Sequence, residues 1–208
     1  MLPSPTLPAT WRGLLEMFRP ACRRSRTFGL FVLLATGLVA QTARRTVVGM
    51  LVGAGVAAVV SFHACCRFFS QHRFDVDRIG LVLARLIVDR LLDAGAPIVV
   101  VVDDTLFRRW GPKVFGAFWT HDGSGQDPNA LGRGNRWVIA GILVRLPFCA
   151  HPVCLPVLAR LWRPRQTGKI AHARELAELI AARYPDRTVH VVGDACWCQK
   201  HCAHHATC

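Results

Sequence analysis

Two long stretches of the chain carry no formal charge, and they limit what it can fold into. Residues 27–43 and 46–66 are 17 and 21 residues long and mostly apolar, which is near the length that spans a bilayer. One interpretation is therefore a small membrane protein with a helical hairpin through 27–66. The other is a pair of buried helices separated by residues 41–45, with Thr46 as the N-cap of the second helix.

The segment that follows favours the second interpretation. Over residues 77–93 the apolar side chains recur at helical spacing and charged ones occupy the other positions, which predicts an amphipathic helix that packs in water. Gly95 and Pro97 end this helix. Residues 97–105 are then a β-branched run ending in two carboxylates, the pattern of a strand that is buried on both faces.

The rest of the chain predicts further strands and one helix. We expect strands over 137–146 and 153–161 in an antiparallel hairpin, a helix over 170–184 and a strand over 188–194. The long connection 106–135 contains a Gly-rich turn at 132–135 and a small extra strand around 114–119. Connections of this length are usually functional.

This order of elements predicts an α/β fold. It divides the chain into a basic helical region over 1–95, a mixed sheet with helices over 96–194 and a Cys/His-rich tail over 195–208. The start of the chain lacks the pattern of a cleavable secretory segment, so we expect its nine cysteines in a reducing, cytoplasmic compartment.

Charge points to a polyanionic partner. The chain has 26 Lys plus Arg against 13 Asp plus Glu, a net charge of +13 and a pI near 10.4. Residues 1–73 contain nine Arg and a single acid, Glu16, so this third holds +8. Such an excess favours nucleic acid first and anionic lipid second. The candidate DNA-binding residues are Arg23, Arg24, Arg26, Arg44, Arg45, Arg67 and Arg73.

Carboxylates at strand ends give a candidate catalytic site. Asp104 and Asp194 each follow an apolar strand, and Asp103 is the alternative to Asp104. If the two strands are parallel neighbours, their carboxyl ends meet at one edge of the sheet, where ligands of α/β sheets bind. Two carboxylates there could hold Mg²⁺, which activates water or a 3′-hydroxyl at a phosphodiester. The ordinary alternative is that each Asp begins a turn.

Short motifs between residues 40 and 195 carry a family resemblance. They are Arg45–Val47, Met50–Leu51, Arg67–Ser70, Val102–Phe107, His121–Ser124, Gly134–Val138, Leu155–Leu161 and Val192–Ala195. In this order the chain resembles a DDE-type insertion-sequence transposase, of the DDE superfamily endonuclease group with a ribonuclease H-like catalytic domain.

The resemblance implies roles for particular residues. Asp104 would be the first catalytic carboxylate and Asp194 the second, holding Mg²⁺ or Mn²⁺ weakly. The basic helical region would help to bind the terminal inverted repeats of the element. The protein would then be associated with the nucleoid, with DNA and full-length transposase as partners; the resemblance implies no particular oligomeric state.

One departure from the family pattern concerns the third acid. The resemblance implies a catalytic Glu well beyond the second Asp, yet no Glu follows Glu178 in this sequence. We therefore expect a C-terminally truncated or frameshifted transposase that does not complete strand cleavage and transfer. A DNA-binding regulator derived from a transposase is the alternative. The tail offers Cys and His side chains, but their spacing is poor for a structural zinc site.

Overall fold

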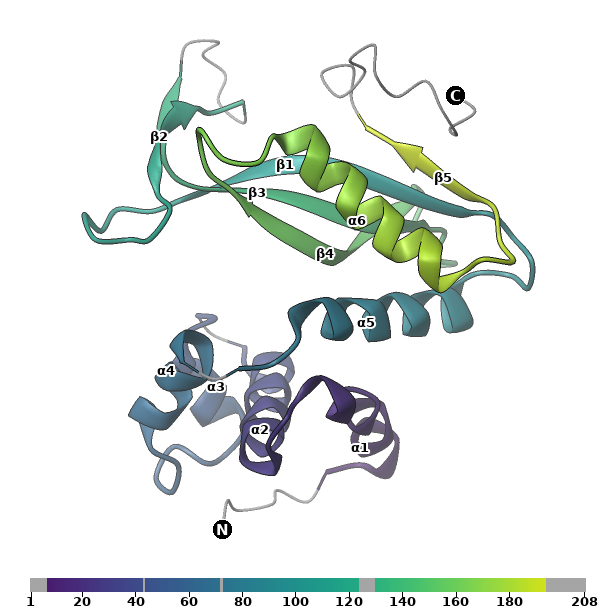
Figure 1. The fold of residues 1–208 in the computed structure, drawn as a ribbon. Coiled ribbons are helices and arrows are strands. Elements are labelled where there is room, and N and C mark those ends of the chain that lie inside the picture. Colours follow the sequence, from purple (N-terminus) through teal and green to yellow (C-terminus); the bar gives the residue numbers. More distant parts are fainter. Residues whose placement is uncertain (1–6, 43, 72, 124–129, 194–208) are drawn as a thin grey trace. The chain divides into compact units, whose positions relative to one another are not determined.

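The computed structural model describes residues 7–42, 44–71, 73–123 and 130–193 (Figure 1). Asp194 and the Cys/His-rich tail lie outside the described residues. The chain forms two compact units, Met1–Val82 and Leu83–Cys208. The helix α5, Val76–Leu91, runs across the boundary between them.

The first unit is helical. Its elements are α1 Ala9–Glu16, the short 3₁₀ helix η1 Arg19–Ala21, α2 Ser25–Ala40, α3 Val47–Gly53 and α4 Phe62–Ser70. The predicted N-cap is confirmed, because the Thr46 hydroxyl accepts a hydrogen bond of 3.1 Å from the backbone N–H of Gly49. Satisfying one of the free amides at the start of a helix in this way stabilises that start.

The two uncharged stretches supply the core of this unit. Leu30, Leu33 and Leu34 of α2 pack with Leu51 of α3 and Phe68 of α4, and all are buried. Gly37 lets α2 and α3 approach closely, since a Cβ there would lie 1.8 Å from the backbone oxygen of Met50. The first uncharged stretch thus lies largely in α2, and the second forms α3 and the start of α4, in agreement with the buried-helix interpretation.

None of the helices in the described part of the chain is both long enough and apolar enough to cross a membrane.

The second unit is built on a mixed five-stranded sheet. The strands are β1 Ile98–Arg108, β2 Phe118–His121, β3 Leu131–Val144, β4 Val153–Trp162 and β5 Val189–Val192, and the helix is α6 Lys169–Arg183. The order is β2-β3-β1-β5, with β4 also paired to β3. The predicted α/β fold, with a helical region ahead of a mixed sheet, is confirmed.

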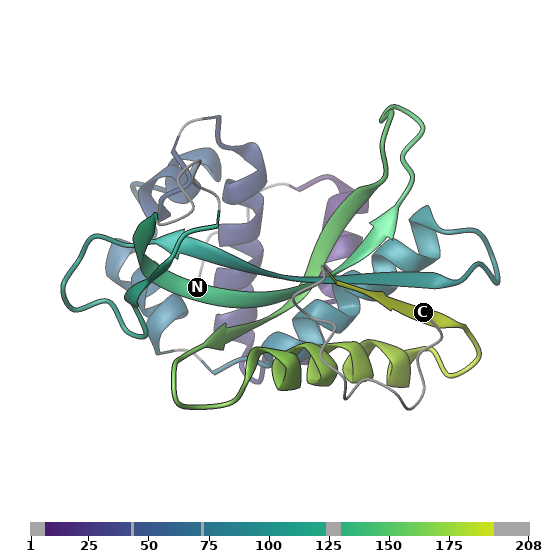
Figure 2. The ribbon, with the colours of Figure 1, turned by 90° about the horizontal axis from the view of Figure 1, so that it is seen from above.

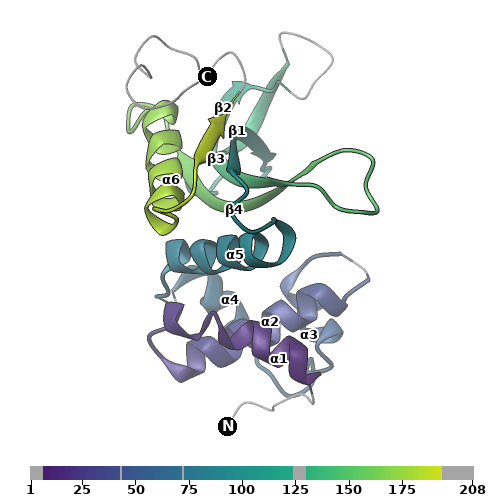
Figure 3. The same cartoon turned by 90° about the vertical axis from the view of Figure 1, so that its right-hand side faces the viewer.

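Strand directions decide where the predicted carboxylates can meet. β3 runs antiparallel to β1 and to β4, whereas β5 runs parallel to β1, with Val101 beside Val192 (Figure 2). The crossover from β4 to β5 passes through α6, which lies against one face of the sheet (Figure 3). β1 and β5 are therefore parallel neighbours, but Asp104 lies inside β1 and not at its end as expected, because β1 continues to pair with β3 as far as Arg108.

Alternation along β1 sets its two faces. Ile98, Val100 and Val102 are buried, while Asp103 and Thr105 are exposed. The buried side chains belong to a core that includes Ile142 of β3 and Leu176 of α6, each fully buried. Burying these side chains is worth roughly 1.5–3 kcal/mol each.

The strands are longer than the sequence pattern indicates. β1 continues to Arg108, and β3 begins at Leu131, so the predicted turn at 132–135 is part of a strand. Glycine is needed in this part of β3 because the backbones of β3 and β1 approach closely there. A Cβ at Gly134 would lie 2.2 Å from the Phe107 carbonyl oxygen. Glycine in a strand often marks such a contact.

Candidate functional site

Asp104 lies on the face of β1 that carries the core. It follows Val100 and Val102 at alternate positions, and its register partner on β3 is Val138. Its side chain is 17% exposed, so the carboxylate stands at the point where the apolar core gives way to solvent. A carboxylate with so little access to water needs partners to stay charged.

Two cations supply those partners. The Arg136 guanidinium on β3 donates from Nη1 to Asp104 Oδ2 at 2.5 Å. The Lys169 ammonium, on the first residue of α6, donates to the same oxygen at 2.8 Å. Arg136 Nη2 also donates to the backbone oxygen of His121. We call Asp104, Arg136 and Lys169 the carboxylate cluster.

The cluster determines the charge state of Asp104. Burial by itself raises the pKa of this carboxyl, but the hydrogen bonds from Lys169 and Arg136, together with their positive charges, outweigh it. The net result is a pKa below the usual value of 3.8. Asp104 is therefore ionised at neutral pH, as a ligand for a cation or a general electrostatic partner must be.

Asp103 belongs to the other face. It is exposed, and its Oδ1 accepts a hydrogen bond of 2.7 Å from the backbone N–H of Asp104. Within the described residues Asp103 has no ion pair. The alternative position predicted from sequence is thus separated by the pleat of β1 from the carboxylate cluster.

A divalent cation fits the chemistry of Asp104 but meets opposing charge. Carboxylate oxygens are the ligands that Mg²⁺ prefers, and Asp104 Oδ1 makes no hydrogen bond with a described residue. However, Arg136 and Lys169 give the cluster a net charge of +1. Over the ranges 7–42, 44–71, 73–123 and 130–193, no three His, Cys, Asp or Glu side chains are grouped so as to hold a metal.

Two other residues considered in the sequence analysis, an acid and a thiol, are explained by their contacts within the protein. Asp122 is buried and accepts from Arg108 at 2.6 Å, which ties β1 to the end of β2. Cys65 is fully buried in the helical core, and burial raises the pKa of its thiol. These residues need no ligand to explain them.

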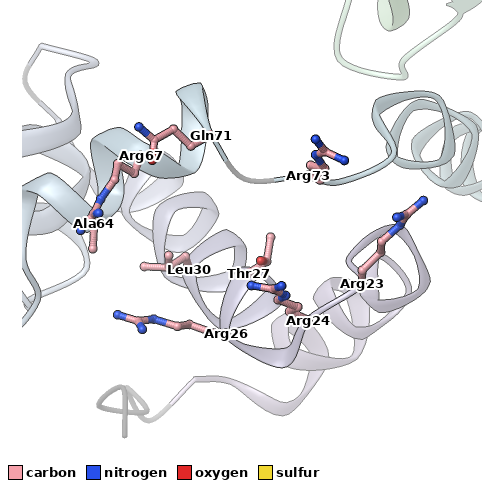
Figure 4. A pocket seen from close by; sticks show the side chains of 9 residues that line it. All are labelled: Arg23, Arg24, Arg26, Thr27, Leu30, Ala64, Arg67, Gln71 and Arg73. Atoms are coloured by element: carbon pink, nitrogen blue, oxygen red, sulfur yellow. The ribbon is translucent and has the colours of Figure 1, made fainter.

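A second candidate site is a basic pocket in the helical unit, with a volume of about 550 Å³ (Figure 4). Its arginines come from the segment before α2, from α2, from α4 and from the chain after α4. They are Arg23, Arg24, Arg26, Arg67 and Arg73. Thr27, Leu30, Ala64 and Gln71 complete the lining.

The basic pocket has no neutralising acid. All five arginines are exposed, no Asp or Glu lines the pocket, and none of the five forms an ion pair with a described residue. Five of the seven arginines predicted from sequence therefore converge, although up to 50 residues separate them. Arg44 and Arg45 are also exposed, but they do not line the pocket.

Arg136 and Lys169 are the site residues that sequence reasoning missed. Their pairing with Asp104 spans 32 and 65 residues, which no local pattern reveals. One local signal was present for Lys169. A cation in the first turn of a helix is disfavoured by the helix dipole, which indicates that a nearby negative group compensates it.

Comparison with known proteins matches the chain to a family. The family model described as DDE superfamily endonuclease matches residues 13–200. No curated protein and no solved structure matches the chain.

Proposed function

The chain belongs to the DDE superfamily endonucleases, and on this premise we propose that it is a transposase chain that acts on the ends of an insertion sequence. The parent reaction is metal-dependent cleavage of a DNA strand followed by transfer of its 3′-hydroxyl to target DNA. The observation that carries the proposal is Asp104 on β1, ionised and beside the parallel strand β5 that leads to Asp194.

We assign Asp104 and Asp194 as the carboxylates that would hold the divalent ion that DDE-family endonucleases generally use, with Mg²⁺ or Mn²⁺ as the expected ions. When bound, such an ion activates the attacking hydroxyl and stabilises charge on the leaving oxygen. Arg136 keeps Asp104 charged and fixes its orientation from the neighbouring strand. The third acid is not assigned, since no Glu follows Glu178 in the 208 residues.

The region before the sheet is proposed to hold the DNA. The basic pocket presents five unneutralised guanidinium groups, each of which can bind a phosphate in a bidentate manner. Neutralising phosphates releases counterions, which makes the affinity strongly salt-dependent. We accordingly place the terminal inverted repeats on residues 1–95, catalysis on 96–194, and the protein with DNA in the nucleoid.

Substitution of pocket arginines tests this assignment. We expect Arg26→Ala and Arg67→Ala to weaken binding to all DNA sequences and to reduce the slope of log affinity against log salt by roughly 0.9 each. Fluorescence anisotropy over a salt series measures both. Arg12→Ala is the matched control, because Arg12 is exposed in the same unit and does not line the pocket.

Equal losses for Arg12→Ala and the pocket variants would contradict a role for the basic pocket. The same titrations test a second candidate function, that of a DNA-binding regulator that occupies element ends. The observation that favours this function is that the basic pocket lies entirely within one unit. Equal affinity for end-bearing and random DNA would remove that candidate. Efficient metal-dependent cleavage of end-bearing DNA that Asp104→Ala abolishes would support the role given to Asp104 and contradict the expectation that this chain does not complete the reaction.

A further inference from the structure

The two cations of the carboxylate cluster are held in different ways. Arg136 is a residue inside the strand β3, and its side chain is 12% exposed. Its guanidinium donates hydrogen bonds to two acceptors, Asp104 and the His121 carbonyl. The Lys169 side chain is 31% exposed. Its ammonium stands on a flexible four-carbon stem, at the helix end where the dipole disfavours a positive charge.

Lys169 has a second contact that does not depend on Asp104. Its Nζ lies 5.1 Å from the centroid of the Trp162 ring, at the end of β4. The face of an indole ring attracts a cation, so the ammonium can leave the carboxylate without losing all stabilisation. Arg136 has no comparable aromatic contact among the described residues.

Loss of one of the two cations would make the cluster a better place for a divalent ion, because each positive group beside Asp104 repels that ion. With both in place the cluster carries +1, which repels a divalent ion, whereas without Lys169 the Asp104–Arg136 pair is neutral. Both cations also use the same oxygen, Oδ2, so displacing Lys169 frees part of that oxygen as well. Arg136 cannot leave as easily, because its guanidinium is more deeply buried.

We propose that Lys169 is an exchangeable counter-ion of Asp104, which occupies the carboxylate in the free protein and gives way when a divalent cation binds, whereas Arg136 is the permanent partner. The inference rests on the proposed function, in which Asp104 is a metal ligand. It adds a competitor to that site: metal affinity is set by how much of the time Lys169 occupies the carboxylate.

A titration of the full chain with Mn²⁺ tests the inference without any activity measurement. Electron paramagnetic resonance detects the free ion and so gives the affinity. If Lys169 occupies the carboxylate for about nine-tenths of the time, Lys169→Met tightens Mn²⁺ binding about tenfold. Lys169→Arg, which keeps the charge, stays near the wild-type affinity or below it. We expect Lys169→Met to fold, because α6 keeps its other contacts: Leu176 and Ile180 are fully buried, and Glu175 pairs with Arg160 of β4 at 2.8 Å.

Lys113→Met is the matched control. It removes the same charge from an exposed position that has no ion pair in the described structure, so a general effect of net charge would tighten binding equally in both variants and overturn the inference. Unchanged or weaker binding in Lys169→Met would overturn it too. Asp104→Asn separates the two claims: loss of Mn²⁺ binding there supports the proposed function whatever Lys169 does, and unchanged binding contradicts both.

Discussion

At the scale of single residues, Asp104 and Arg136 show how a charge is kept at the edge of an apolar core. The carboxylate occupies the next position on the strand face that carries the buried Val100 and Val102, and the guanidinium from the neighbouring strand compensates the lost hydration. Removing one member of such a pair leaves the other uncompensated, which is more costly than replacing both.

The pKa of Asp104 makes this contribution depend on pH. Because the pKa is lowered in the folded protein, ionised Asp104 stabilises the fold at pH above its usual value of 3.8, and this stability is lost as pH falls through the lower folded value. We expect Asp104→Asn to reduce the free energy of unfolding by about 1–3 kcal/mol at pH 7.

Urea unfolding of both proteins at pH 7 and at pH 3 measures the difference. The gap between wild type and Asp104→Asn should narrow at the lower pH. A gap that is the same at both values, or wider at pH 3, would contradict the ionised, doubly bonded carboxylate described for the folded protein.

At the scale of elements, the apolar patterns predicted most helices and strands but not their close contacts. The strand over 97–105 and the helix over 170–184 agree with β1 and α6 to within three residues, because periodicity reports which side chains are buried. The sequence did not reveal that Gly134 lies within a strand, since a Gly-rich stretch reads as a turn until the partner backbone is known.

The same reasoning limits what could be predicted of the site. Asp104 could be found because it follows an apolar run, and the parallel neighbour β5 could be anticipated from its own apolar run. The convergence of Arg67 with Arg24 needed the packing of α2 against α4, which no spacing along the chain specifies.

Close helix packing gives a prediction at this scale. Gly37→Ala should destabilise the helical unit by about 3 kcal/mol or more, because its Cβ would collide with backbone atoms of Met50 that cannot rotate away. Gly13→Ala is the control: it is also helical, nothing lies within 4 Å of its Cβ position, and it should be neutral or stabilising by about 0.5–1 kcal/mol.

Thermal unfolding followed by circular dichroism compares the two variants. Equal stabilities would mean that α2 and α3 do not pack through Gly37, and the arrangement of the uncharged stretches given above would be wrong.

At the scale of the whole molecule, the two units divide the properties that DNA processing requires. The helical unit carries the basic pocket, and the sheet unit carries the carboxylate cluster. The family match, over residues 13–200, covers both features. The central proposal is that Asp104, on β1, and Asp194, two positions beyond the last residue of β5 in the sequence, share one divalent ion.

An experimental structure of the full chain with bound Mn²⁺ tests that claim most directly, because the anomalous scattering of manganese locates the ion independently of the protein atoms. We predict a single strong peak in contact with carboxylate oxygens of both Asp104 and Asp194, with the Lys169 ammonium withdrawn from Asp104. A peak that touches neither residue, or Asp104 and Asp194 side chains too far apart to share an ion, would contradict the account.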